Sequence, residues 1–211
     1  MSGHNILVFC AHSDDEAVGM GGTIAKYVAE GKEIIKVVFS YGESSHPHFK
    51  EEVVIKRRVD ETERASRFIG IKKTAFLGMK DTKVTEELNK RGLDVVKSII
   101  KRYDPERIFV PSSQDPHPDH QAVHRAVLHA VDSMKKDYHV FAYEVWNIVK
   151  EQHPFIYVDV TPYFKKKLDY IRLFRSQWQY MYALWLPVNI RSIAYGLKAN
   201  CRYAERFYKI R

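Results

Sequence analysis

The chain has 211 residues, 45% of them hydrophobic, which is enough for one α/β domain with a substantial core. No stretch is long and apolar enough to span a bilayer, and the N-terminus lacks a signal-peptide pattern, so we expect a cytoplasmic protein without stable membrane insertion. The two cysteines, Cys10 and Cys201, indicate a reducing compartment. The net charge of +8 is spread over short basic runs, which favours solvated helix faces, and no nucleic-acid partner is expected.

Strand-like apolar runs alternate with helical patterns along the chain. The predicted strands cover residues 6–10, 33–39, 74–77, 107–111, 139–146 and 154–160, and the predicted helices cover 17–31, 51–69, 85–100, 118–133 and 161–177. This alternation predicts a Rossmann-like, mostly parallel sheet with helices on both faces. We expect a single domain over 1–211, with a Rossmann-like core in 1–160 and a helical, aromatic-rich part in 161–211.

The first cluster of acids, Ala11-His12-Ser13-Asp14-Asp15-Glu16, stands where the first strand ends and the first helix begins. In open α/β sheets, ligands bind at that end of the strands. His12 and Asp15 offer a nitrogen and an oxygen ligand for a divalent metal such as zinc, and Asp14 would be a carboxylate close to a metal-bound water. Because Asp and Glu also cap helix N-termini, a purely structural role for this cluster stays open.

A second cluster, Asp115-Pro116-His117-Pro118-Asp119-His120, follows the apolar run at 107–111. Two clusters that each follow a strand would converge on one edge of a parallel sheet, which predicts a metal-assisted hydrolase. The loop between the second strand and the second helix carries His46 and His48. These are candidate secondary metal or substrate contacts, or simply exposed loop histidines.

With both clusters, the chain resembles the PIG-L/LmbE family of zinc-dependent de-N-acetylases. The family patterns A-H-P-D-D-E and H-P-D-H stand here as Ala11–Glu16 and His117–His120, and weaker likenesses extend over most of the chain. Ser13 replaces the usual proline of the family, which would stiffen the turn.

The resemblance implies a metal centre and two catalytic side chains. His12, Asp15 and His120 would bind one Zn²⁺, or another divalent ion, and leave a position open for water. Asp14 would be the general base, and protonated His117 would hold the oxyanion of the tetrahedral intermediate.

The resemblance also implies supporting residues. Asp115, Asp119 and Glu16 would orient the ligands or tune His117, although Glu16 would also suit a helix N-terminus. Arg58 is a candidate substrate-binding residue, with a surface ion pair as the alternative.

The implied activity is removal of the N-acetyl group from an N-acetylglucosamine-type sugar or glycoconjugate, by attack of zinc-bound water on the acetamide carbonyl. Two alternatives stay open: another metal-dependent hydrolase, such as a phosphoesterase or a different amidase, and a non-catalytic binding protein on the same scaffold.

The resemblance also implies a possible homo-oligomer, a trimer or a hexamer. The aromatic residues after Gln177 suit subunit contacts or sugar rings, and equally suit simple core packing.

Overall fold

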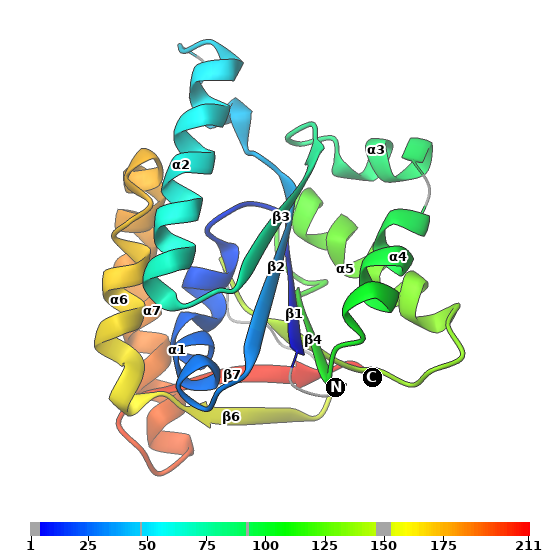
Figure 1. Cartoon of the computed structure of the whole chain (residues 1–211). Coiled ribbons are helices and arrows are strands. Elements are labelled where there is room, and N and C mark those ends of the chain that lie inside the picture. The colour runs from blue at the N-terminus through cyan, green and yellow to red at the C-terminus, as the bar shows by residue number, and fades with distance from the viewer. Residues whose placement is uncertain (1–4, 47, 92, 147–152) are drawn as a thin grey trace.

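The computed structural model describes residues 5–46, 48–91, 93–146 and 153–211. A seven-stranded sheet runs through the middle of the molecule (Figure 1), with the strand order β3-β2-β1-β4-β5-β7-β6. The strands are β1 Asn5–Cys10, β2 Glu33–Ser40, β3 Lys73–Met79, β4 Arg107–Pro111, β5 His139–Tyr143, β6 Phe155–Asp159 and β7 Ala204–Lys209. All neighbouring pairs are parallel except those that β7 forms with β5 and β6. The predicted fold class, a mostly parallel α/β sheet, is therefore confirmed.

Helices cover both faces of the sheet (Figure 1). One layer contains α1 Asp15–Ala29, α2 Glu51–Ile69, α6 Phe164–Ile171 and α7 Trp178–Lys198, and the other contains α3 Val84–Arg91, α4 Asp94–Tyr103 and α5 Pro118–Asp132. Successive residues of a strand point to opposite faces, so Ile6 and Val8 of β1 join one hydrophobic core while Leu7 and Phe9 join the other. Both faces of β1 are buried, which explains its continuous apolar sequence.

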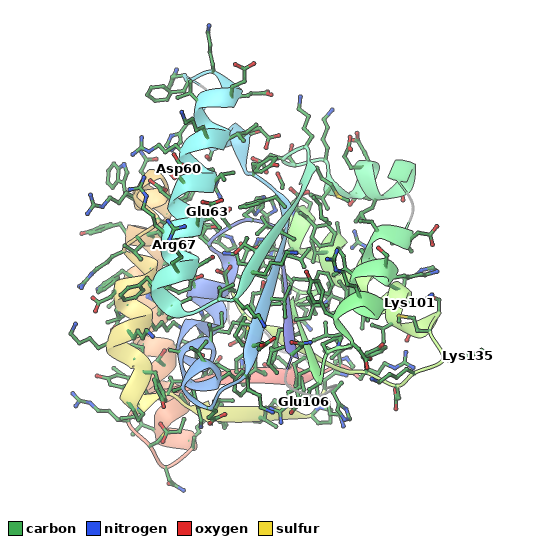
Figure 2. The ribbon with its side chains drawn as sticks, in the orientation of Figure 1. Asp60, Glu63, Arg67, Lys101, Glu106 and Lys135 are labelled. Carbon is green, nitrogen blue, oxygen red and sulfur yellow. The ribbon has the colours of Figure 1, made fainter. Side chains whose placement is uncertain are left out.

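Helix α2 shows how charge is kept at the surface. Its outer side carries Asp60, Glu63 and Arg67, which are labelled in Figure 2, while Ala65 is among the residues buried on its inner side. The helix ends as predicted at Gly70, which has φ of 102° and donates its N–H to the carbonyl of Ser66.

The structure corrects three predicted elements. The single helix expected over 85–100 is two helices, because α3 ends at Arg91 and Asp94 begins α4. The helix expected over 161–177 is shorter: α6 is flanked by 3₁₀ turns at Thr161–Tyr163 and Arg175–Gln177. The part expected to be helical, 161–211, also contains β7, whose partners lie far away in sequence.

The strand order reverses between β1 and β4, which are neighbours in the sheet although the strands β2 and β3 come between them along the chain. The connections from these two strands leave toward opposite faces, so a crevice opens at their carboxyl ends. Both acid and histidine clusters begin there. Among the described residues, no helix has the length and apolar character needed to cross a membrane.

Candidate metal centre and catalytic cleft

The turn after β1 leaves the carboxylate of Asp14 available for chemistry. Asp14 is the N-cap residue of α1, yet its side chain makes no capping hydrogen bond; only its backbone carbonyl accepts, from the N–H groups of Ala17 and Val18. The carboxylate of Asp15 accepts the backbone N–H of His12 at 2.9 Å. The first cluster is thus more than a helix start, because one acid faces the cleft and the other folds back toward His12.

His12, Asp15 and His120 come together at the edge of the sheet. Oδ1 of Asp15 lies 3.2 Å from Nε2 of His120 and 3.9 Å from Nδ1 of His12. His120 is fully buried, and Nε2, its ring nitrogen nearest Asp15, makes no well-directed hydrogen bond. Buried polar atoms of this kind require a partner. A cation between Asp15 and the two histidines would supply one, so the residues present fit the metal that the sequence implies.

The charges around the two histidines also fit a cation. Burial alone would lower the pKa of His12, but the carboxylates of Asp119, Asp81 and Asp15 raise it to about 10. For His120, burial is likewise outweighed by Asp15 and Asp115, which raise its pKa to about 9. The site therefore holds an excess of negative charge, which protons balance when no metal is bound.

Ligand atoms at this place form more than one possible set. Nitrogen atoms of His12, His117 and His120 lie within 4.8 Å of one another, and so do ligand atoms of His12, Asp81 and Asp119. His12 belongs to both groups, which places it at the centre of the candidate metal site. The set predicted from the sequence contains Asp15 where the first of these groups has His117. It therefore includes one negatively charged ligand and leaves the ring of His117 available to the substrate.

Asp115 and Asp119 hold the second cluster in place. Asp115 lies with Oδ1 3.0 Å from Nδ1 of His120 and accepts the backbone N–H of His117 at 3.0 Å. Asp119 accepts the backbone N–H of Thr82 at 2.8 Å, while its Oδ2 lies 3.6 Å from Nε2 of His12. Each of the two acids therefore lies close to a predicted metal ligand, and their supporting role stays a prediction.

A backbone hydrogen bond holds the ring of His117 at the edge of the cleft. Its Nδ1 accepts the backbone N–H of Asp119 at 3.2 Å, so the ring proton is on Nε2. Burial, with repulsion from His12 and His120, lowers the pKa of His117 below its usual value of 6.5. A neutral imidazole still offers one N–H donor at Nε2.

Glu16 points away from the cleft into the layer between β1 and the helices. Its buried carboxylate accepts hydrogen bonds from Lys36 and from the hydroxyl of Tyr170, each at 2.5 Å. Burial raises the pKa of Glu16, against the opposing effect of Lys36. Glu16 therefore contacts Lys36 and Tyr170, behind the turn that follows β1, rather than His12 or His120.

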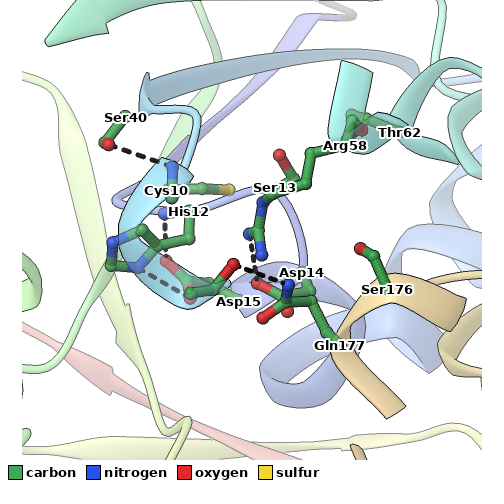
Figure 3. Close-up of polar contacts among 12 residues, drawn as sticks. Cys10, His12, Ser13, Asp14, Asp15, Ser40, Arg58, Thr62, Ser176 and Gln177 are labelled. Atoms are coloured by element: carbon green, nitrogen blue, oxygen red, sulfur yellow. Dashed lines mark hydrogen bonds and ion pairs between the residues drawn. The ribbon is translucent and has the colours of Figure 1, made fainter. Parts of the chain in front are cut away.

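Arg58 reaches from α2 toward Asp14, as Figure 3 shows. One guanidinium nitrogen lies 3.7 Å from Oδ1 of Asp14, and the side chain is only 4% exposed, so the alternative of a surface ion pair is wrong. Gly42 makes room for it: a Cβ there would lie 2.8 Å from Cζ of Arg58. Its role in substrate binding stays a prediction.

A cleft of about 310 Å³, at the lower end of the range for small-molecule sites, is lined by His12, Asp14, Asp15, Arg58 and His117 among others. Sequence reasoning missed part of its wall, namely Asp81, Thr82, Ser44, Ser45, Val145, Trp146, Gln177, Tyr180, Met181 and Leu184. Asp81 could have been found, because it follows the end of β3 much as His12 follows β1. Its Oδ1 lies 3.0 Å from Nε2 of His12, which lowers its pKa to about 2 although burial opposes this.

The two loop histidines lie apart from this cleft. Nε2 of His46 contacts the backbone carbonyl of Ser176 at 2.6 Å, which ties the loop to the 3₁₀ turn before α7, and His48 is exposed. Neither is among the residues that line the cleft or form the candidate metal groups.

Comparison with known proteins gives a consistent result. The family model "PIG-L: GlcNAc-PI de-N-acetylase" matches residues 7–131. The probable N-acetyl-alpha-D-glucosaminyl L-malate deacetylase 2 of Bacillus cereus is 30% identical over 189 residues, which cover 84% of this chain and 85% of the relative. The structure of N,N'-diacetylchitobiose deacetylase from Pyrococcus horikoshii superposes with a TM-score of 0.83 at 26% identity, over 97% of this chain and 82% of that chain.

The same fold also occurs with a different chemistry. GalB, the 4-carboxy-2-hydroxymuconate hydratase of Pseudomonas putida KT2440, superposes with a TM-score of 0.85 over 100% of this chain and 97% of that chain, at 21% identity. At this identity the likeness shows the fold alone. The activity must therefore be argued from the site.

Proposed function

Because the chain belongs to the PIG-L family, we propose that it is a metal-dependent hydrolase that removes the N-acetyl group from an N-acetylglucosamine-type sugar. The observation that supports this most is the meeting of the two clusters, with Asp15 Oδ1 3.2 Å from His120 Nε2 and Asp14 on the same turn. The relatives with the highest identity quoted above carry the names of sugar deacetylases.

In this proposal His12, Asp15 and His120 hold a single divalent ion, for which zinc suits the nitrogen and carboxylate donors. When bound, such an ion polarises a carbonyl group and lowers the pKa of a nearby water. The contacts of Asp115 with His120, and of Asp81 and Asp119 with His12, fix the orientation of both imidazole rings.

Asp14 is the proposed general base. It takes a proton from the attacking water and returns it to the sugar nitrogen as the C–N bond breaks, so that the products are acetate and a free amine. A guanidinium nitrogen of Arg58 lies 3.7 Å from Oδ1 of Asp14, so a positive charge stands beside this carboxylate. The same arginine lines the cleft and can donate to a hydroxyl of the sugar.

His117 is the proposed donor to the acetamide oxygen. Its Nδ1 is held by the N–H of Asp119, so Nε2–H is the group available to the substrate. Negative charge develops on that oxygen when water attacks the carbonyl, and a preorganised donor stabilises it more in the transition state than in the ground state.

The far wall of the cleft suits a sugar. Trp146 and Tyr180 place their rings edge to face, with centroids 6.0 Å apart, and both line the cleft. Aromatic faces pack against the apolar side of pyranose rings, while Gln177, Ser44 and Ser45 offer hydrogen bonds to hydroxyl groups.

The test is release of acetate and of a primary amine from a panel of N-acetylglucosamine conjugates, with zinc-loaded and metal-free protein. We expect metal-dependent release, and a loss of about 10²- to 10⁴-fold in kcat for Asp14→Asn. Asp60→Asn, on the outer side of α2, is the matched control and should keep full activity.

Two results would contradict the proposal. Cleavage of phosphate esters but of no N-acetyl sugar by the metal-loaded protein would favour a phosphoesterase. Sugar binding without any hydrolysis, unchanged in Asp14→Asn, would favour a non-catalytic binding protein.

A further inference from the structure

Lys36 is a fully buried lysine in the middle of β2, where its strand partners are Val8 and Thr74. The surrounding sequence, Ile34-Ile35-Lys36-Val37-Val38, is otherwise apolar and equally buried. An unpaired ammonium group in such a place costs several kcal/mol. The contacts of Lys36 must therefore account for its presence.

The ammonium group of Lys36 has two oxygen partners. It donates to the backbone carbonyl of Ser13 and, at 2.5 Å, to Oε1 of Glu16. The carboxylate of Glu16 is fixed in turn by the hydroxyl of Tyr170 at 2.5 Å and by the thiol of Cys10 at 3.2 Å. Through Glu16, Lys36 thus links the turn after β1 to Cys10 of β1 and Tyr170 of α6.

These two partners flank the catalytic acids. The carbonyl of Ser13 belongs to the peptide plane that leads into Asp14, and Glu16 follows Asp15 directly. Lys36 lies outside the cleft and is shielded from solvent, so it acts only through the turn. We propose that Lys36 is a positioning residue, which fixes the peptide plane before Asp14 and thereby the direction of the Asp14 and Asp15 carboxylates. This inference deepens the proposed function and rests on it for the activity readout.

Ser13 provides an independent way to examine this role. A proline at this position would fix φ covalently, whereas serine leaves φ free. Within the part of the chain that the structure describes, the N–H of Ser13 donates no hydrogen bond, so a proline would remove none. If Lys36 constrains the turn, a proline at position 13 should replace part of that constraint.

The experiment compares the double variant Lys36→Met/Glu16→Gln with the wild type. Removing both charges leaves no unpaired ion in the core, so the protein should fold. We expect kcat to fall by about 30- to 100-fold with KM within about threefold, because small misplacement of catalytic groups has effects of this size. The dissociation constant for zinc, measured by chelator competition, should rise about tenfold, since Asp15 is a proposed ligand.

Adding Ser13→Pro to the double variant should raise kcat by about tenfold and recover part of the loss in zinc affinity. The control Lys72→Met/Glu33→Gln removes an exposed ion pair next to the same strand and should change neither quantity. If the methionine variant does not fold, Lys36→Gln/Glu16→Gln retains polar side chains in the core and is expected to show the same losses, at least about tenfold in each.

A folded variant whose kcat and zinc affinity stay within about threefold of wild type would overturn the role of Lys36. So would a proline variant with raised thermal stability but no recovery of either quantity. If the wild type deacetylates no sugar at all, the proposed function fails by itself, and the zinc affinities still decide whether Lys36 positions Asp15.

Discussion

Nδ1 of His120 lies 3.0 Å from Oδ1 of Asp115, and both side chains are almost completely buried. The same carboxylate accepts backbone N–H groups from His117 at 3.0 Å and Trp146 at 3.2 Å, so the main chain fixes it on two sides. His120 consequently presents Nε2 to Asp15 in an orientation that Asp115 sets. Carboxylates in this position orient a histidine ligand and raise its basicity.

Replacement of Asp115 by asparagine is expected to weaken zinc binding about 10- to 100-fold, because the amide carries no charge and can satisfy fewer of these contacts. Chelator competition on purified protein measures the effect. Asp137→Asn is the control, since that side chain is 85% exposed and lies in an ion pair with Arg211. Equal zinc affinities for the two variants would show that Asp115 does not support the metal site.

Binding of zinc should release protons. With pKa values of about 10 for His12 and about 9 for His120, both imidazoles are protonated at neutral pH in the metal-free protein. A cation must displace them, so about two protons should leave per ion at about pH 7. Zinc affinity should therefore increase with pH, and the release should decline as pH rises through the two pKa values, because the protons are then already lost.

Calorimetry in two buffers of different ionisation enthalpy counts these protons. An unchanged heat of zinc binding between the buffers, at about pH 7, would mean that no proton is displaced. The high pKa values of the metal-free histidines would then be wrong.

The sequence was sufficient to locate the candidate site, but not to identify the residues that hold its side chains in place. His12 and His120 could be placed near each other because each follows a strand, and parallel strands end at a common edge. The partners of Glu16 could not be inferred, since Lys36 and Tyr170 approach it from segments 20 and 154 residues away. The orientation of the His117 ring depends on one backbone hydrogen bond, which no residue pattern specifies.

Two glycines of α1 should respond differently to alanine. At Gly19 a Cβ would lie 2.4 Å from Cδ2 of Tyr143 and 2.9 Å from the carbonyl oxygen of Glu144, and that backbone atom cannot move aside easily. At Gly21 the nearest atom would be Cγ of Lys167 at 3.2 Å, a contact that a shift of a few tenths of an ångström relieves. We expect Gly19→Ala to lower the free energy of unfolding by about 1–3 kcal/mol.

Gly21→Ala should be close to neutral, because the better helix propensity of alanine, about 1 kcal/mol, offsets a mild contact. Urea unfolding of both variants measures the difference. A loss for Gly21→Ala as large as for Gly19→Ala would indicate that the contact with Tyr143 and Glu144 is not what requires a glycine.

The carboxylate of Glu205 in β7 caps backbone N–H groups at a break within α1. The helix is interrupted at Met20, which has φ of −146° and ψ of 20°, so the N–H groups just beyond the kink lie at a new helix start. Oε1 of Glu205 accepts the N–H of Gly22 at 3.0 Å, and Oε2 accepts that of Thr23 at 2.7 Å. Its charge is balanced by Lys167, whose Nζ donates to Oε1 at 2.6 Å in a fully buried position.

Glu205→Gln should therefore lower the free energy of unfolding by about 3–5 kcal/mol, because it leaves the ammonium group of Lys167 buried and unpaired. Adding Lys167→Met should recover a large part of that loss, since the core is then free of charge. Asp169→Asn, which breaks the exposed pair with Lys165, is the control and should cost less than about 0.5 kcal/mol. If Glu205→Gln proves no more damaging than this control in urea unfolding, the strand β7 does not cap the second half of α1.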